Sequence, residues 1–67
     1  MISVQVNAEQ RRVEEGTSLA ALLHEMGKDH SGIAVAMDGS VVTRSEWQNV
    51  TLRDGSRIEI MTAVQGG

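Results

Sequence analysis

A single stripe of apolar side chains at helical spacing constrains this chain of 67 residues more than any other feature. The stripe follows positions i, i+3, i+4 and i+7 and consists of Leu19, Leu22, Leu23 and Met26. Ser18, or Thr17 before it, can cap the first turn of such a helix, and Gly27 stands where a helix commonly ends. A chain of this size forms one domain with a small core, so the remaining residues must bury the stripe.

Most of the other apolar residues alternate with polar ones, which is the period of half-buried strands. Such strands are predicted at residues 2–7, around Val13, and at residues 33–37, 40–43 and 57–64. The polar residues 7–10 are expected to form a turn, Asp38-Gly39 is a tight-hairpin signal, and Ser45 is expected to cap one helical turn that contains Trp47. This order predicts an α+β fold, in which a small mixed sheet packs on one main helix and the first and last strands lie parallel at its centre.

The inward positions of these elements define the predicted core, and Trp47 is expected to plug the edge of the sheet. The core positions are Ile2, Val4, Leu22, Leu23, Val35 and Ile60. Because Ile58 and Ile60 both point inward, the alternation places Glu59 and Met61 on the opposite face of the sheet. We therefore expect a folded domain over residues 1–62 and a flexible tail over residues 63–67.

Composition and charge exclude several functional classes. The formal net charge is −3 and Trp47 is the single aromatic residue, so neither a basic face nor a stacking platform for nucleic acid is expected. The sequence has no cysteine, no apolar run long enough to span a membrane and no signal sequence, which favours a cytoplasmic protein. His24 and His30 are expected at the surface, and no metal site is predicted, because a metal ion would also need carboxylates such as Asp29.

The chain ends on Gly66-Gly67, which is the one place where the sequence suggests chemistry. A free α-carboxylate is ionised at neutral pH and is a poor electrophile. ATP can convert it into an acyl-adenylate, which a sulfur or nitrogen nucleophile can then attack. Two residues without a Cβ suit a narrow channel in the enzyme that performs this step. The alternative interpretation is an ordinary chain end without a role.

The whole chain, and its carboxyl-terminal half most strongly, resembles the ThiS-type sulfur carriers, which are ubiquitin-like β-grasp proteins. The resemblance rests on the segment "IAVAMDGSVVTRSEWQ", on an L-x-D-G turn at residues 52–55 and on the ending I-x-I-x-T-A-V-Q-G-G at residues 58–67. The sequence departs from the usual pattern of that family at Asp38, where Asn is common, and at Thr43, where Pro is common.

This resemblance implies a carrier that is a co-substrate, binds no cofactor itself and is not an enzyme. A ThiF-like adenylating enzyme would use ATP to adenylate Gly67, and sulfur from cysteine, passed on by a cysteine desulfurase, would convert the end into a thiocarboxylate. The thiazole synthase ThiG would then take this sulfur for the thiazole of thiamin. Gly66 would give access to the reacting carbonyl. The partner's channel would hold the preceding residues, which are Met61, Thr62, Ala63, Val64 and Gln65.

A surface for partner proteins is expected on the sheet face opposite the helix. Ala34, Ala36 and Glu59 should lie there, and the small alanine side chains would allow another chain to approach closely.

Other functions stay open at this point. The small subunit of molybdopterin synthase is similar in fold and ending, although members of that group are usually longer. A sulfur carrier for another metabolite, a protein modifier joined to lysines through Gly67, and a plain interaction domain are the remaining alternatives.

Overall fold

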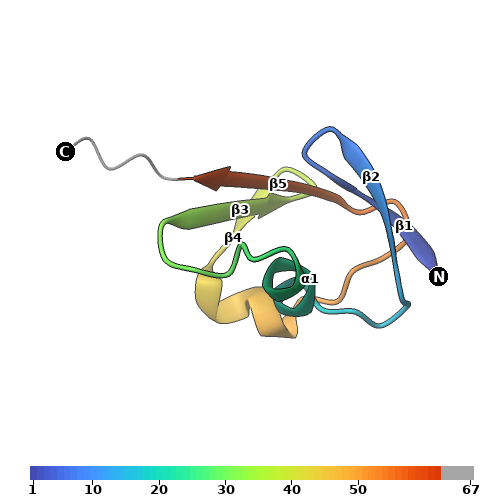
Figure 1. Cartoon of the computed structure of the whole chain (residues 1–67), viewed down its shortest axis with the longest axis horizontal. Helices are drawn as coiled ribbons and strands as arrows, with labels where there is room; N and C mark the ends of the chain where they lie inside the picture. The colour runs from blue at the N-terminus through green and yellow to red at the C-terminus, as the bar shows by residue number, and fades with distance from the viewer. Residues whose placement is uncertain (63–67) are drawn as a thin grey trace.

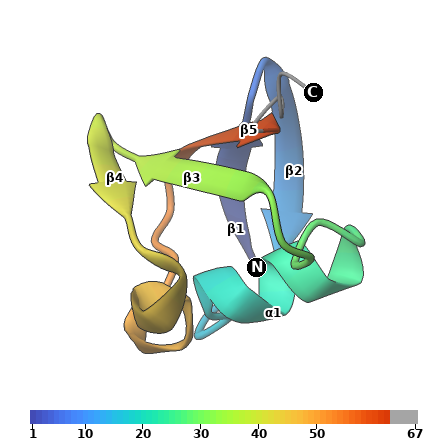
Figure 2. The ribbon, with the colours of Figure 1, turned by 90° about the vertical axis from the view of Figure 1, so that its left-hand side faces the viewer.

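The computed structural model describes residues 1–62, within which it shows a five-stranded sheet and two helical segments. In chain order the elements are β1 (Ile2–Val6), β2 (Glu9–Val13), α1 (Leu19–Glu25), β3 (Ile33–Met37), β4 (Ser40–Val42), the 3-10 helix η1 (Arg44–Asn49) and β5 (Arg57–Thr62). Figure 1 and Figure 2 show α1 and η1 on the same side of the sheet. The predicted α+β fold is confirmed, and the predicted tail over residues 63–67 lies outside the described residues.

The strand order of the sheet is β2-β1-β5-β3-β4. The central pair, β1 and β5, is parallel and joins Gln5 to Arg57 and Val6 to Ile58, while the other neighbours are antiparallel. Antiparallel neighbours can be joined by tight turns, whereas a parallel pair needs a long crossover, and the segment from α1 to η1 provides it. The first and last strands therefore lie side by side at the centre, as predicted.

Both ends of α1 are capped as the sequence suggests. The Ser18 Oγ accepts a hydrogen bond from the backbone N–H of Ala21 at 3.0 Å, which satisfies one free donor of the first turn. At the other end Gly27 adopts a φ of 71°, a value that glycine takes without steric cost. The following residue, Lys28, donates its N–H to the carbonyl of Leu23 at 2.8 Å, and this closes a Schellman-type turn.

The core lies between α1, η1 and one face of the sheet. Four of the six predicted core residues are buried, and the other two, Ile2 and Ile60, are half-buried and pack against its margin. The buried cluster consists of Val4, Val6, Val13, Leu19, Leu22, Leu23, Val35, Trp47, Leu52 and Ile58. The alternation within single strands therefore identified the inward face of the sheet. It could not predict how deeply each inward side chain is buried.

The segment after β4 forms a longer helix than predicted. The 3-10 turn begins when Glu46 donates its N–H to the carbonyl of Thr43 at 2.9 Å, so Thr43 is the N-cap and the predicted cap at Ser45 is wrong. This earlier start places Trp47 over the core, where it is 4% exposed. Its indole N–H donates to a carbonyl at the end of β4 at 3.0 Å, which confirms the predicted plug at the edge of the sheet.

Two turns that connect strands use residues with positive φ. Asp38 and Gly39 have φ values of 51° and 87°, as a type I′ turn requires, and the predicted hairpin is confirmed. The turn between β1 and β2 is shorter than predicted and occupies residues 7–8, where Asn7 has a φ of 55°. The predicted strand around Val13 is β2, which starts at Glu9 and ends at Val13.

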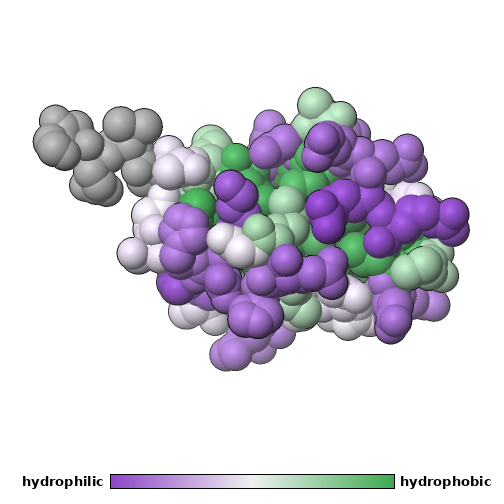
Figure 3. Space-filling model, viewed as in Figure 1, coloured by the Kyte–Doolittle hydropathy of each residue, from purple (hydrophilic) through white to green (hydrophobic). Residues whose placement is uncertain are grey.

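The surface of the described part of the chain is mixed in character. Figure 3 shows hydrophilic side chains over much of the face in view, with hydrophobic ones between them. Neither helical segment within residues 1–62 has the length and apolar character that crossing a membrane requires.

Replacing Leu23 by Ala should lower the free energy of unfolding by about 2–5 kcal/mol, because its side chain is enclosed on all sides and leaves a cavity. The matched control is Val41→Ala on β4, since the Val41 side chain is 73% exposed; its effect should stay within about 0.5 kcal/mol. Urea unfolding followed by circular dichroism measures both variants. Equal losses in the two would contradict the assignment of the core.

Candidate functional site

Two of the predicted site residues lie at one end of the sheet. Met61 and Thr62 are the last two residues of β5, and both are exposed. Ala63, Val64, Gln65, Gly66 and Gly67, which complete the predicted channel segment and the sulfur-carrying position, lie outside the described residues. The structure therefore describes the part of the sheet from which this segment starts.

The face opposite α1 carries the predicted partner residues. In the antiparallel register of β3 with β5, Ala34 lies opposite Met61 and Ala36 lies opposite Glu59. These four residues alternate with the inward-facing Val35 and its neighbours, so they lie on the face of the sheet that turns away from the core. The predicted common face is thus present.

Ala36 differs from the prediction in its exposure. It was expected to be open to a partner, but it is 7% exposed, whereas Ala34 is exposed as expected. The register places Ala36 between Val41 on β4 and Glu59 on β5, and both of these carry longer side chains. The longer side chains on both sides cover the Ala36 methyl group. Ala36 is therefore recessed in this face and offers a partner little contact surface.

The prediction omitted one residue of this surface, Val41. It pairs with Ala36 across β3 and β4 and is 73% exposed, which makes it one of the large apolar side chains that the fold leaves in solvent. Met61 is another, at 48% exposed. The alternation in "SVVT" could have indicated this position, because Val42 pairs with the buried Val35 and Val41 must then point the other way.

We call this surface the β3–β5 face and define it by Ala34, Ala36, Val41, Glu59 and Met61. It combines two exposed apolar side chains with one carboxylate and a flat floor of alanine. Since Met61 belongs both to this face and to the predicted channel segment, a protein docked on the face would also touch the start of that segment.

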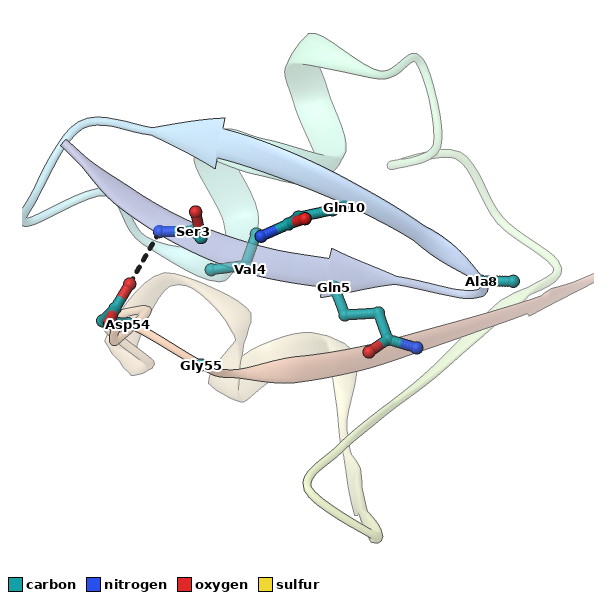
Figure 4. A pocket seen from close by; sticks show the side chains of 7 residues that line it. All are labelled: Ser3, Val4, Gln5, Ala8, Gln10, Asp54 and Gly55. Carbon is teal, nitrogen blue, oxygen red and sulfur yellow. Dashed lines mark hydrogen bonds between the residues drawn. The ribbon is translucent and has the colours of Figure 1, made fainter.

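A hollow beside β1 has a structural role. Figure 4 shows its lining side chains, among which the Asp54 carboxylate accepts the backbone N–H of Ser3 at 2.9 Å. Gly55 donates its own N–H to the carbonyl of Ser3 at 2.7 Å. The other polar side chains around the hollow are the Ser3 hydroxyl and the amides of Gln5 and Gln10, and no histidine or lysine lines it. These contacts join β1 to the turn before β5.

The histidines also lie where the sequence placed them, at the surface. His24 Nδ1 donates to the Asp29 carboxylate at 2.9 Å, and this hydrogen bond lowers the pKa of Asp29 below its ordinary value. Arg44 donates to the backbone carbonyl of Asp29 and lies 5.3 Å from the centre of the Trp47 ring. The cluster ties the loop after α1 to η1. Within residues 1–62 no group of three or more metal-ligating side chains comes together.

Comparison with known proteins gives consistent results. A family model described as the ThiS family matches residues 4–67. The chain is 36% identical over 64 residues to the sulfur carrier protein ThiS of Thermus thermophilus, an alignment that covers 96% of this chain and 98% of the relative. It is also 32% identical over 62 residues to a thiazole synthase of Paramagnetospirillum magneticum, where 92% of this chain aligns with 19% of that protein. The chain thus spans about a fifth of this longer relative.

Solved structures show the same fold. The crystal structure of the thiamine biosynthesis protein ThiS from Geobacter metallireducens superposes with a TM-score of 0.84, at 23% sequence identity, and covers 98% of this chain and 100% of that one. The solution structure of a thiamine biosynthesis protein from the same organism gives a TM-score of 0.75 at 23% identity, covering 98% of this chain and 88% of that one. From the family match and the near full-length relative, we conclude that this chain belongs to the ThiS family.

Proposed function

We propose that this chain is a sulfur carrier for thiamin thiazole biosynthesis, with the sulfur held on the terminal carboxyl of Gly67. The observation that carries the proposal is the ThiS family match, which runs through to residue 67 and so includes the Gly66-Gly67 ending. The Thermus thermophilus relative, whose name is sulfur carrier protein ThiS, supports it along nearly its full length.

The proposed chemistry has two steps. In the first, a carboxylate oxygen of Gly67 attacks the α-phosphorus of ATP on an adenylating enzyme, and pyrophosphate leaves. In the second, a sulfur nucleophile attacks the carbonyl carbon, AMP leaves, and hydrosulfide as the donor gives the thiocarboxylate directly. A persulfide donor, as a cysteine desulfurase would supply, forms an acyl disulfide at this step, and a thiol must then cleave the donor's own sulfur–sulfur bond to release the thiocarboxylate.

The chain's own residues present the terminal carboxyl of Gly67 to the partner enzyme and do not catalyse the reaction. Residues 1–62 form a packed support whose last strand, β5, precedes the reacting end. The groups that activate the carboxylate belong to the partner enzyme. That enzyme also binds ATP and receives the sulfur donor. Gly66 and Gly67 have no side chain beyond hydrogen, so a narrow active site could accept them in many backbone conformations.

The β3–β5 face is the proposed docking surface for these partners. Its exposed apolar side chains, Val41 and Met61, would lose contact with water on binding, and its position beside the end of β5 would bring the partner to the reacting segment. A thiazole synthase is supported as one partner. Two relatives with that name, from Paramagnetospirillum magneticum and Magnetococcus marinus, contain a stretch similar to most of this chain.

Deleting Gly67 should abolish carrier activity without unfolding the domain. The deletion moves the carboxylate by roughly 3.5 Å of extended chain. A displacement of about 1 Å can already cost on the order of a hundredfold in rate. Pyrophosphate exchange with a ThiF-type adenylating enzyme measures the first step, and the intact mass after addition of hydrosulfide measures the second.

The matched variant for this deletion adds one Ala after Gly67, which converts the reacting carboxyl into a peptide carbonyl. It should be as inactive as the deletion, while urea unfolding of both variants should stay within about 0.5 kcal/mol of the parent chain. Exchange and sulfur loading at the parental rate in either variant would refute the carrier function.

Ala34→Arg should weaken binding to the adenylating enzyme by about tenfold or more, because a long charged side chain would stand beside Met61 on the β3–β5 face. Ala21→Arg is the matched control, since Ala21 is also exposed but lies on α1, away from this face. Titration calorimetry with the purified adenylating enzyme gives both affinities. If the two variants bind equally well, the docking surface lies elsewhere.

A further inference from the structure

We propose that Asn7 is a positioning residue, which holds the end of β5 in the plane of the sheet and so fixes where the reacting segment begins. This role rests on the proposed carrier function and adds a residue that lies sixty positions away from Gly67 in the sequence.

The central strand pair is short. β1 pairs with β5 through Gln5↔Arg57 and Val6↔Ile58, and then the chain turns into β2 at Asn7. The Asn7 N–H donates to the carbonyl of Ile58 at 2.8 Å, which continues the ladder by one bond. β5, however, extends to Thr62, well past this turn, as Figure 1 shows.

The side chain of Asn7 takes the place of the missing strand residue. Its Oδ1 accepts the backbone N–H of Ile60 at 2.8 Å, so β5 is held on the β1 side two residues beyond the last backbone contact. Asn suits this position because it tolerates the φ of 55° found here and carries a short side-chain acceptor. Gln5 also donates its Nε2 to the Asn7 carbonyl at 3.1 Å, which supports the turn.

On its other side the end of β5 is held by β3. The register continues through Ala34↔Met61 and Ile33↔Thr62. Asn7 therefore supplies the second support of a strand end that would otherwise be paired along one edge only. A strand held along both edges cannot swing out of the sheet, whereas one held along a single edge can twist about that edge.

The direction of β5 matters because the reacting segment is short. In the proposed function residues 63–67 lead from Thr62 to the reacting carboxyl of Gly67, and a fully extended chain of that length reaches at most roughly 17 Å. In a partner docked on the β3–β5 face, the distance from that face to the partner's active site is fixed. A segment this short cannot compensate for a β5 that points in the wrong direction. Only the fraction of molecules with β5 correctly placed can react, and the apparent affinity falls by that fraction.

Asp38 provides a matched control at the other end of β5. It has a φ of 51°, its N–H donates to the carbonyl of Arg57 at 2.8 Å, and its Oδ1 accepts the N–H of Arg57 at 3.0 Å. Both residues thus have a positive φ at the first position of a two-residue turn, and both accept a backbone N–H of β5 with a side-chain oxygen. They differ in which end of the strand they hold.

The experiment compares Asn7→Gly, Asn7→Asp and Asp38→Gly with the parent chain. Glycine accepts the positive φ and removes only the side-chain acceptor, while aspartate keeps the acceptor. Carrier-dependent pyrophosphate exchange with a ThiF-type adenylating enzyme gives kcat and KM for each chain. Asn7→Gly should raise KM by about three- to tenfold at unchanged kcat, because fewer molecules present β5 correctly. Asn7→Asp and Asp38→Gly should stay within about twofold of the parent, although Asp38→Gly should lose as much stability in urea as Asn7→Gly.

Amide hydrogen exchange gives a readout that does not depend on the partner. The Ile60 amide should be protected in the parent and in Asn7→Asp, and should exchange faster in Asn7→Gly. An unprotected Ile60 amide in the parent would overturn the inference. This test needs only the parent chain, so it holds even if Asn7→Gly does not fold. An unchanged KM in folded Asn7→Gly, or an equal rise in Asp38→Gly, would overturn it while leaving the carrier function intact. If the parent chain supports no exchange at all, the proposed function is wrong and the positioning role with it.

Discussion

The parallel pairing of β1 with β5 is the interaction on which the rest of the structure depends. It is short, yet it joins two halves that are otherwise separate, the β1–β2 hairpin and the β3–β4–β5 group. The apolar stripe of α1 needs both halves, because Val4 and Val6 come from one of them and Val35 and Ile58 from the other. Hydrogen bonds from the Ser3 N–H to the Asp54 carboxylate and from the Ile60 N–H to the Asn7 side chain brace the pair at its two ends.

β5 has three roles. Because its side chains alternate between the two faces of the sheet, the residues that serve the core are separate from those that face outward. Ile58 faces inward and belongs to the core, while Glu59 and Met61 face outward and belong to the β3–β5 face. The same strand then leads into the residues that the proposed chemistry uses. A substitution on the outward face can therefore alter recognition with little effect on stability, because the alternation keeps its side chain out of the core.

Local patterns were sufficient to predict most of the fold. The stripe of α1, its Ser18 cap and the alternation of β3 and β5 are each encoded within a few neighbouring residues, and the structure follows them. The burial of Ala36 could not be predicted in this way, since it depends on Val41 and Glu59 from two other strands. The start of η1 at Arg44 depends on where Trp47 finds space above the core.

The role of Asn7 was the least accessible to sequence reasoning. A polar residue between two strand patterns indicates a turn. The local pattern therefore assigns Asn7 to a turn and indicates no further role for it. Its contact with Ile60 spans 53 positions along the chain, and no local pattern records such a contact. The residues that could be assigned from sequence are those whose environment is set by close neighbours, and the residues that could not are those whose environment depends on other strands.

The central place of β5 also governs the order in which the protein can fold as it is made. Strand β1 leaves the ribosome first, but its parallel partner follows more than 50 residues later, as the separation of 53 between Asn7 and Ile60 illustrates. At translation speeds of about 5–20 residues per second, the first hairpin waits for several seconds with one edge open and with Val4 and Val6 uncovered. Contacts so distant in sequence also slow folding, since a long loop must close before they form. The strand that completes the sheet is thus the one that precedes the proposed reacting end, and a nascent chain that has not yet reached Thr62 lacks part of the proposed docking surface.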